Sequence, residues 1–239
     1  EFRRVLFRSV RDAFFDLRRQ LQQDAQQVIA VALPPRPTLP NVEPGTTIPD
    51  FIDTLYGHTS GAVVGEAHGS IASKQFIIDN LPHLSRKQVK TLYMEHLQTD
   101  LHQADLDRFA DTGQMSKTLL HDLKKLDRDY ATDPNKVYTF ESLVIQAREH
   151  GLEVRAIDCS ASYHLEGLKN KAPTTRQQMM NFFASRTIRK HQEVMGSHNW
   201  IALVGNTHAN TFQKIVPGVA ELEGAIRSEE HTSELQSQP

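Results

Sequence analysis

The sequence of 239 residues has almost no cysteine, no excess of charge of one sign and no long apolar run, and each absence excludes a class of protein. Cys159 is the only cysteine, which excludes an internal disulfide and a zinc site built from several cysteines. The formal net charge of −2 gives no electrostatic reason to expect nucleic acid as a partner. No stretch approaches the roughly 18–20 apolar residues of a membrane-spanning helix. We expect a globular domain with no transmembrane span in this sequence.

Motifs of several common enzyme classes are also missing. The glycines of GEAHGS (65–70) match neither the G-x-G-x-x-G dinucleotide motif nor a P-loop, and no G-x-S-x-G nucleophile motif occurs. A thiol nucleophile made by Cys159 with His208 is conceivable, but a cysteine in a buried strand is more often inert. The sequence therefore indicates neither a nucleotide site of these types nor a serine nucleophile on an elbow.

The two ends of the sequence have an unusual relation to each other. Residues 1–9 (EFRRVLFRS) and 227–235 (RSEEHTSEL) can be encoded by reverse-complementary DNA, with Glu1 as GAG opposite Leu235 as CTC. Nine codons in antisense register are typical of sequencing-adapter DNA read at both ends of an assembled fragment. We expect residues 1–9 and 227–239 to be adapter-derived and exclude them from the predicted fold. Residues 10–226 could then be one domain of a longer protein.

Residues 10–226 divide into an N-terminal segment, 10–46, and an alternating region, 47–226. In the first, residues 10–32 have helical spacing and the proline-rich stretch 33–45 predicts an extended strap. In the second, the predicted strands are 61–66, 90–97, 153–159 and 200–205. The predicted helices are 48–57, 70–81, two within 100–130 that separate near Gly113, 139–151, 174–196 and 206–213. Strands separated by helices predict an α/β fold, a Rossmann-like three-layer sandwich with a mostly parallel central sheet.

Polar side chains stand at the end of each predicted strand. In chain order they are Glu66 and His68, Glu95 and His96, Asp158, and Asn206 and His208. In parallel α/β sheets the carboxyl ends of the strands share one edge, where ligands bind. We therefore expect most of these side chains to line one cleft, with Gly65 and Gly69 turning the chain so that the first pair points into it.

Simpler explanations stay open for each of these residues. A glutamate or histidine just past a strand is often a solvated loop residue, and Asp158 could cap the turn that follows it. Glu95 and His96 are adjacent, so in a regular strand they face opposite sides of the sheet. We interpret Glu95 as the side chain that faces the cleft and His96 as structural.

Four stretches, in this order, resemble a known superfamily. VVGEAHGS (63–70), TLYMEHL (91–97), VRAID (154–158) and WIALVGNTHA (200–209) resemble the superfamily of erythromycin esterases, haem-binding ChaN proteins, Tiki/TraB proteases and a C-terminal domain of the Pasteurella mitogenic toxin. TLYMEHLQTDLHQADLDRF and NTHANTF also resemble bacterial toxins that contain a membrane-targeted effector domain. The resemblance covers roughly residues 47–224 and implies a ChaN/esterase-like domain over residues 47–226.

This resemblance also implies where the protein acts and what its shared residues do. It implies a bacterial protein secreted or delivered into a host or competitor cell, with any membrane association supplied by domains outside this sequence. By resemblance to the esterase-like members, Glu66, His68 and His208 act in water-driven hydrolysis. By resemblance to the Tiki-like members, His68 and Glu95, with Glu66, hold a divalent metal. The ChaN-like site is associated with haem, but no haem-ligating tyrosine is identifiable here.

We expect a hydrolase-like domain of a secreted toxin or effector, either esterase-like or metal-dependent. Without a metal, His68 or His208 takes a proton from water, and Glu66 or Glu95 orients that imidazole. Asn206 and the other histidine then stabilise the developing oxyanion. With a metal, His68, Glu95 and His208 bind Zn, Mn or Fe. The alternatives are a non-catalytic module that binds haem or another ligand, and a structural domain of a large toxin. The sequence specifies neither the substrate nor the bond cleaved.

Overall fold

The computed structural model describes residues 2–28, 32–38, 43–130 and 133–228, and its centre is a five-stranded sheet in the order β3-β2-β4-β1-β5. The strands are β1 (Gly61–Glu66), β2 (Val89–Gln98), β3 (Glu153–Asp158), β4 (Asn199–Gly205) and β5 (Ile226–Ser228). Each pair of neighbouring strands runs parallel. The predicted α/β sandwich with a parallel sheet is confirmed, and each predicted strand is present to within one residue at either end.

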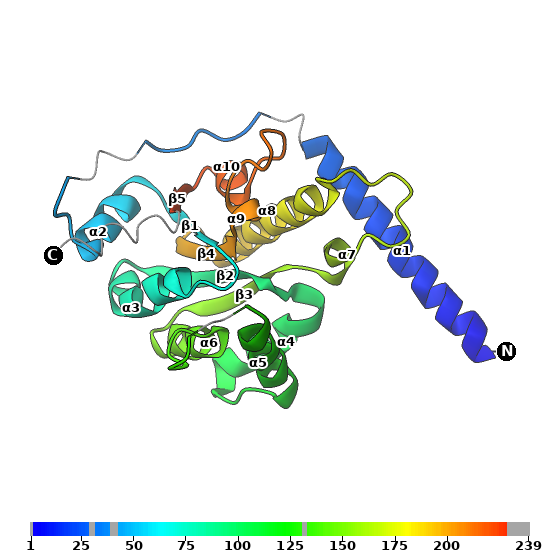
Figure 1. Ribbon diagram of the computed structural model, residues 1–239, viewed down its shortest axis with the longest axis horizontal. Coiled ribbons are helices and arrows are strands. Elements are labelled where there is room, and N and C mark those ends of the chain that lie inside the picture. The colour runs from blue at the N-terminus through cyan, green and yellow to red at the C-terminus, as the bar shows by residue number, and fades with distance from the viewer. Residues whose placement is uncertain (1, 29–31, 39–42, 131–132, 229–239) are drawn as a thin grey trace.

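Helices cover both faces of the sheet (Figure 1). One face carries α2 (Ile48–His58), α3 (Ala72–Arg86), α4 (Thr99–Thr112), α5 (Lys117–Tyr130) and α6 (Phe140–Glu149). The other carries α7 (Ser160–Tyr163), α8 (Thr175–Met195), α9 (Asn206–Ala209) and α10 (Val219–Glu223). Alternate strand residues divide accordingly: Val64 and Met94 lie in the core beneath α3 and α6, whereas Val63 and Tyr93 lie in the core beneath α8. This division also decides which helices meet each side chain at the strand ends.

Local signals begin and end the helices of the first layer. Thr47 Oγ1 accepts a hydrogen bond from the Asp50 backbone N–H at 3.2 Å, and Thr139 Oγ1 accepts one from the Ser142 N–H at 2.9 Å. Both are N-caps, which satisfy a backbone donor that the helix itself leaves unpaired. Gly113 ends α4 with a φ of 73°, a left-handed conformation that costs glycine little. The predicted break between the two helices of 100–130 is therefore confirmed.

The C-terminal region differs from the prediction in two ways. The helix predicted over 206–213 is the single turn α9, after which Phe212 and Val216 pair in an antiparallel bridge. The sequence does not predict β5, because three residues are too few to show a period-two pattern. Arg227 and Ser228 pair with β1, so β5 crosses the boundary expected at residue 226. The predicted adapter-derived residues 1 and 229–239 lie outside the described residues.

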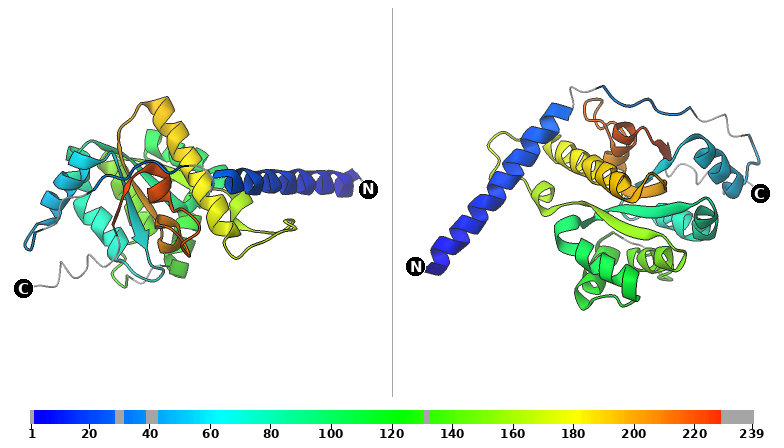
Figure 2. Two further views of the ribbon diagram at one scale, coloured as in Figure 1. Left: turned by 90° about the horizontal axis from the view of Figure 1, so that it is seen from above. Right: turned by 180° about the vertical axis from the view of Figure 1, so that it is seen from behind.

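The long helix α1 (Phe2–Val28) crosses α8 near the C-terminal end of α1, and its N-terminal part extends away from the sandwich (Figure 2). It includes residues 2–9, which the predicted fold leaves out. The ring of Phe15 lies against Gly167, and Leu21 and Ala25 are buried. Arg18 is 2% exposed, and its guanidinium donates hydrogen bonds to backbone carbonyl groups around α7. The C-terminal half of α1 is therefore the part that contacts the body.

The strap after α1 has no regular structure in its described parts, 32–38 and 43–46, as predicted. Arg36 attaches it to the edge of the sandwich: its Nε donates to the Ala225 carbonyl at 3.1 Å, and its Nη1 lies 3.3 Å from Glu221 Oε1. Residues 39–42 of the predicted strap and residues 29–31 of the predicted helix lie outside the described residues. Among the described residues, no helix is both long and apolar enough to cross a membrane.

Removing residues 1–9 is expected to change the melting temperature by no more than about 2 °C, because the buried contacts of Arg18, Leu21 and Ala25 with the body all remain. Removing residues 227–239 also takes away part of the pairing of β5 with β1 and should lower the melting temperature further. Thermal melts of both truncated proteins test this. A large loss on removing residues 1–9 would show that this end is integrated structure.

Candidate active site

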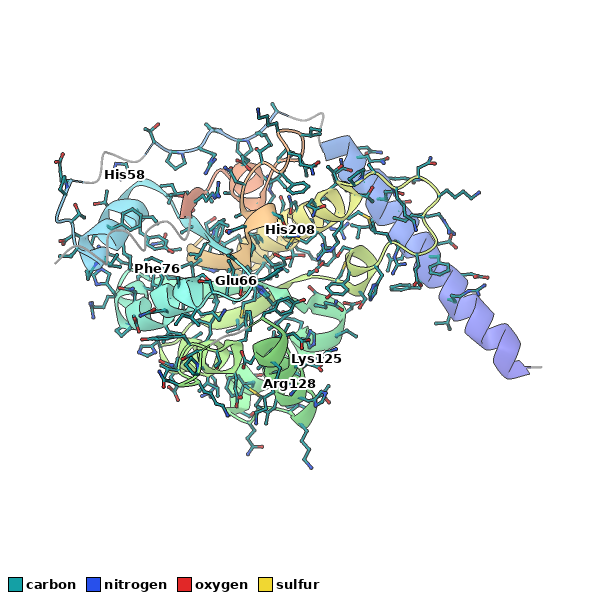
Figure 3. All side chains as sticks on the ribbon, in the orientation of Figure 1. His58, Glu66, Phe76, Lys125, Arg128 and His208 are labelled. Carbon is teal, nitrogen blue, oxygen red and sulfur yellow. The ribbon has the colours of Figure 1, made fainter. Side chains whose placement is uncertain are left out.

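The carboxyl ends of β1, β2, β3 and β4 meet beside a cavity of about 610 Å³. Four of the predicted site residues line it: His68, Glu95, Asp158 and His208. Glu66 is 1% exposed and lies behind this wall, in contact with His68. Figure 3 labels Glu66 and His208, which lie in the middle of the molecule between the two helical layers. The structure therefore brings the predicted side chains of four strands to one place.

His96 also lines the cavity, which corrects its interpretation as a structural residue. Glu95 and His96 do leave β2 on opposite faces: Glu95 lies 3.3 Å from His208, and the His96 ring packs 4.6 Å from that of Phe140 in α6. However, β2 loses its regular register with β3 after Met94. Because the strand end is irregular, side chains that leave β2 on opposite faces of the sheet, Glu95 and His96, both reach the same cavity.

The first half of the site is centred on Glu66. Its Oε1 accepts a hydrogen bond from Lys74 Nζ at 3.1 Å, and its Oε2 accepts one from His96 Nε2 at 2.8 Å. His68 Nδ1 lies 3.4 Å from the same Oε2. Burial alone would raise the pKa of Glu66, but the hydrogen bond and charge of His96, together with Lys74, lower this pKa to about 2. Glu66 is therefore a buried carboxylate that holds one histidine and contacts a second.

The sequence prediction missed Lys74, although a signal for it exists. Lys74 is fully buried and also donates to the Ser70 carbonyl at 3.0 Å. It stands three, four and seven residues before Ile77, Ile78 and Leu81, which form the buried face of α3. A lysine on the apolar face of a helix is almost never fully buried unless it is paired, so its position indicates a carboxylate partner.

The second half of the site lies on the α8 side of the sheet. His208 Nε2 stands 3.3 Å from Glu95 Oε1, and Glu95 Oε2 accepts a hydrogen bond from the Gly205 N–H at 2.7 Å. Burial lowers the pKa of His208, although the charge of Glu95 acts in the opposite direction. Burial would raise the pKa of Glu95, but the neighbouring His208, His96 and Arg176 lower it overall. This pairing favours a neutral imidazole beside an ionised carboxylate.

Asp158 lies in the same cavity wall and binds Arg176. The sequence prediction included Asp158 but missed Arg176. Asp158 Oδ2 accepts from Arg176 Nη2 at 2.6 Å, and its Oδ1 accepts from the Cys159 N–H and the Ser162 hydroxyl. Burial raises the pKa of Asp158 to about 6 in spite of Arg176. Arg176 Nη2 also lies 3.8 Å from Glu95 Oε1, so one guanidinium joins the two carboxylates.

Asn206 does not belong to the cavity wall. Its side chain is exposed, and its Oδ1 is the nearest atom that a Cβ atom on Gly65 would meet. Gly65 lies within β1 and does not make the expected turn; a larger residue there would displace the Asn206 side chain. The expected turn is at Gly69, with a φ of 88°. The oxyanion role of Asn206 stays a prediction from the sequence.

The predicted metal ligands His68, Glu95 and His208 do not form the group whose ligand atoms lie closest together. Among the described residues, one group has ligand atoms all within 4.8 Å of one another: Glu66, His68 and His96. Glu95 and His208 instead pair with each other on the opposite face of the sheet. The difference arises because Glu66 and His96, on β1 and β2, face the same side, whereas Glu95 faces the other.

Replacing Glu66 with glutamine is expected to reduce the acid sensitivity of the protein. Because the pKa of Glu66 is lowered from 4.5 to about 2, its ionised form stabilises the fold fully above pH 4.5, and this stabilisation is lost as the pH falls toward 2. Urea unfolding between pH 7 and pH 3 measures the effect. The difference in unfolding free energy between wild type and Glu66→Gln should be largest above pH 4.5 and shrink below it; a constant difference would contradict the prediction.

Comparison with known proteins relates this chain to bacterial toxins. No family model matches the sequence. A segment of the multifunctional-autoprocessing repeats-in-toxin (MARTX) protein of Vibrio vulnificus is 27% identical over 180 residues, which are 73% of this chain and 3% of that toxin. The chain thus spans a small part of this relative, and the similarity is to a toxin segment.

Solved structures of toxin domains have the same fold. RRSP, a MARTX toxin effector domain from Vibrio vulnificus CMCP6, has a TM-score of 0.64 at 23% identity, over 77% of this chain and 36% of that chain. The C-terminal region of Pasteurella multocida toxin, described as having a thiol-protease-like catalytic triad, has a TM-score of 0.62 at 17% identity, over 77% of this chain and 24% of that chain. The chain is therefore similar to effector domains of bacterial toxins. Its wider relation to erythromycin esterases, ChaN and Tiki proteins stays a prediction.

Proposed function

We propose that this chain, which is similar to effector domains of bacterial toxins, is a hydrolase-like catalytic domain that acts in a host or competitor cell and activates water without a metal. The observation that carries the proposal is the pair of His208 Nε2 and Glu95 Oε1, 3.3 Å apart in the wall of the cavity. A neutral histidine beside an ionised carboxylate is the arrangement of a general base and the group that stabilises its protonated form.

In the proposed reaction, water in the cavity gives a proton to His208 Nε2 as its oxygen attacks the substrate. The imidazolium that forms is stabilised by Glu95, which the Gly205 N–H holds in place. The same proton then passes from Nε2 to the leaving group, so the histidine ends as it began. His68, with a side chain that is 65% exposed, is held by Glu66 and is the side chain we assign to the developing oxyanion.

The residues present do not fit a resident divalent ion. Two histidines and one carboxylate, as in Glu66, His68 and His96, suit Zn, Mn or Fe in kind. However, both Glu66 oxygens already accept hydrogen bonds, and one of these comes from a fully buried ammonium group, Lys74, at 3.1 Å. A divalent cation at this carboxylate would meet the repulsion of Lys74, which already supplies the positive charge.

Dialysis against EDTA is therefore expected to leave both the melting temperature and the turnover unchanged. The melt, the turnover and the metal content by mass spectrometry are measured before and after dialysis and after adding back zinc or manganese. If activity disappears with EDTA and returns with one metal, Glu66, His68 and His96 hold a catalytic ion and the metal-free proposal is wrong.

A thiol mechanism receives no support from the structure. Cys159 is 6% exposed, burial raises the pKa of its thiol, and its Sγ faces the Ser162 hydroxyl at 3.6 Å. Cys159 is not part of the cavity wall that contains His208. Cys159 and His208 therefore do not form a thiol–imidazole pair.

The proposed function is tested with panels of ester and peptide substrates. Turnover that is lost in Glu95→Gln supports a hydrolase. A Soret band on adding haem, without turnover, supports the alternative of a binding module. If the folded protein shows neither turnover nor a Soret band, it is a structural domain of a larger toxin. Either of these last two outcomes overturns the proposal.

A further inference from the structure

We infer that Asn181, in α8, is a positioning residue that fixes the tautomer of His208 and keeps its Nε2 atom free of hydrogen. This inference rests on the proposed role of His208 as a general base. No motif marks Asn181, which lies 27 residues before the histidine in the chain. It is 1% exposed, and its Oδ1 stands 2.7 Å from His208 Nδ1.

The orientation of the Asn181 amide follows from its second partner. Its Nδ2 donates a hydrogen bond to the backbone carbonyl of Pro217 at 2.8 Å. A carbonyl oxygen can only accept, so the opposite orientation would place two acceptors against each other. Asn181 Oδ1 therefore faces His208, and because this oxygen also only accepts, the hydrogen between them must be on His208 Nδ1.

The position of this hydrogen decides whether His208 can act as a base. A neutral imidazole carries one N–H, so a hydrogen on Nδ1 leaves the Nε2 lone pair free to take a proton. Without Asn181, the negative charge of Glu95 Oε1, 3.3 Å from Nε2, would favour the tautomer with its hydrogen on Nε2. That hydrogen would occupy the atom that must accept the proton from water.

The other groups around His208 do not replace Asn181 in this role. The charged or titratable groups that face it are Glu95 and His96 from β2, Arg176 from α8 and His68 from the loop after β1. The hydrogen-bond partner that His208 Nδ1 has among the described residues is Asn181. The choice between the two tautomers therefore depends on Asn181.

The tautomer is measured directly by long-range ¹H–¹⁵N NMR of the labelled protein, with His208→Gln identifying the signal. In the wild type above the pKa of His208, Nε2 should give the shift of an unprotonated nitrogen and Nδ1 that of an N–H. Asn181→Ala should move the hydrogen to Nε2. Asn181→Asp keeps an acceptor for Nδ1 and should retain the tautomer while raising the pKa of His208. Asn80→Leu, in α3, is the control for loss of a partly buried asparagine, since Asn80 Nδ2 bonds the Phe76 carbonyl of its own helix.

Turnover adds a readout that a purely structural role would not move. Asn181→Ala should lower kcat by about 10-fold or more with little change in KM, since a wrong tautomer disables the base without removing a substrate contact. Asn181→Asp should retain part of kcat and shift the acid limb of the pH–rate profile to higher pH. Asn80→Leu should change neither.

The outcomes separate this inference from the proposed function. A wild-type signal with the hydrogen on Nε2 overturns the inference without any variant, as does an unchanged tautomer in Asn181→Ala. If the tautomers are as expected but no protein hydrolyses any substrate, the proposed function fails and the positioning of His208 by Asn181 stands.

Discussion

Replacing Lys74 with methionine is expected to lower the free energy of unfolding by about 3–5 kcal/mol, the usual cost of leaving one partner of a buried ion pair without the other. Methionine keeps the length and packing of the side chain but removes the ammonium group 3.1 Å from Glu66 Oε1. Both side chains of this pair are fully buried, so water cannot replace the lost partner. Urea unfolding at pH 7 measures the change.

A second variant distinguishes lost charge pairing from lost packing. The double variant Glu66→Gln with Lys74→Met removes both charges and should recover part of the stability lost in the single variant. Lys124→Met, on the exposed surface of α5, should stay within about 0.5 kcal/mol of the wild type. A loss of less than about 1 kcal/mol in Lys74→Met would show that the pair contributes little.

Replacing His208 with alanine is expected to lower the rate of the proposed hydrolysis by about 100-fold or more, because general-base catalysis contributes at least this much. A histidine just past a strand is often a solvated loop residue, but His208 is only 6% exposed. Its removal leaves Asn181 Oδ1 without its partner, which costs about 1–3 kcal/mol. Turnover and a thermal melt on the same sample separate the two effects.

The matched control is His121→Ala, which removes an exposed histidine of α5. It should keep both the rate and the melting temperature of the wild type. A folded His208→Ala protein with full activity or toxicity would show that the strand-end residues are not the site. If His208→Ala is unfolded, His208→Gln, which keeps a polar partner for Asn181, decides the same question.

The sequence by itself determines the elements and their common edge. Short continuous apolar runs such as 61–66 and 200–205, separated by amphipathic helices, predict a parallel sheet covered on both faces. In such a sheet the strand ends share one edge, so Glu66, Glu95, Asp158 and His208 could be assigned to one cleft without coordinates. These inferences need only backbone geometry and side chains close together in the chain.

Only the tertiary structure decides the partners within that cleft. At the end of β2, where the register with β3 is irregular, His96 reaches the cavity beside Glu95, although alternation predicts one inward side chain. Lys74 and Asn181 lie on helices that the sequence predicts. However, the partner of Lys74 is Glu66 at the end of β1, and the partner of Asn181 is His208, which follows β4. Side-chain pairing depends on how far each element is shifted and rotated against the sheet. Those shifts are set by packing over the whole core, so no local pattern contains them.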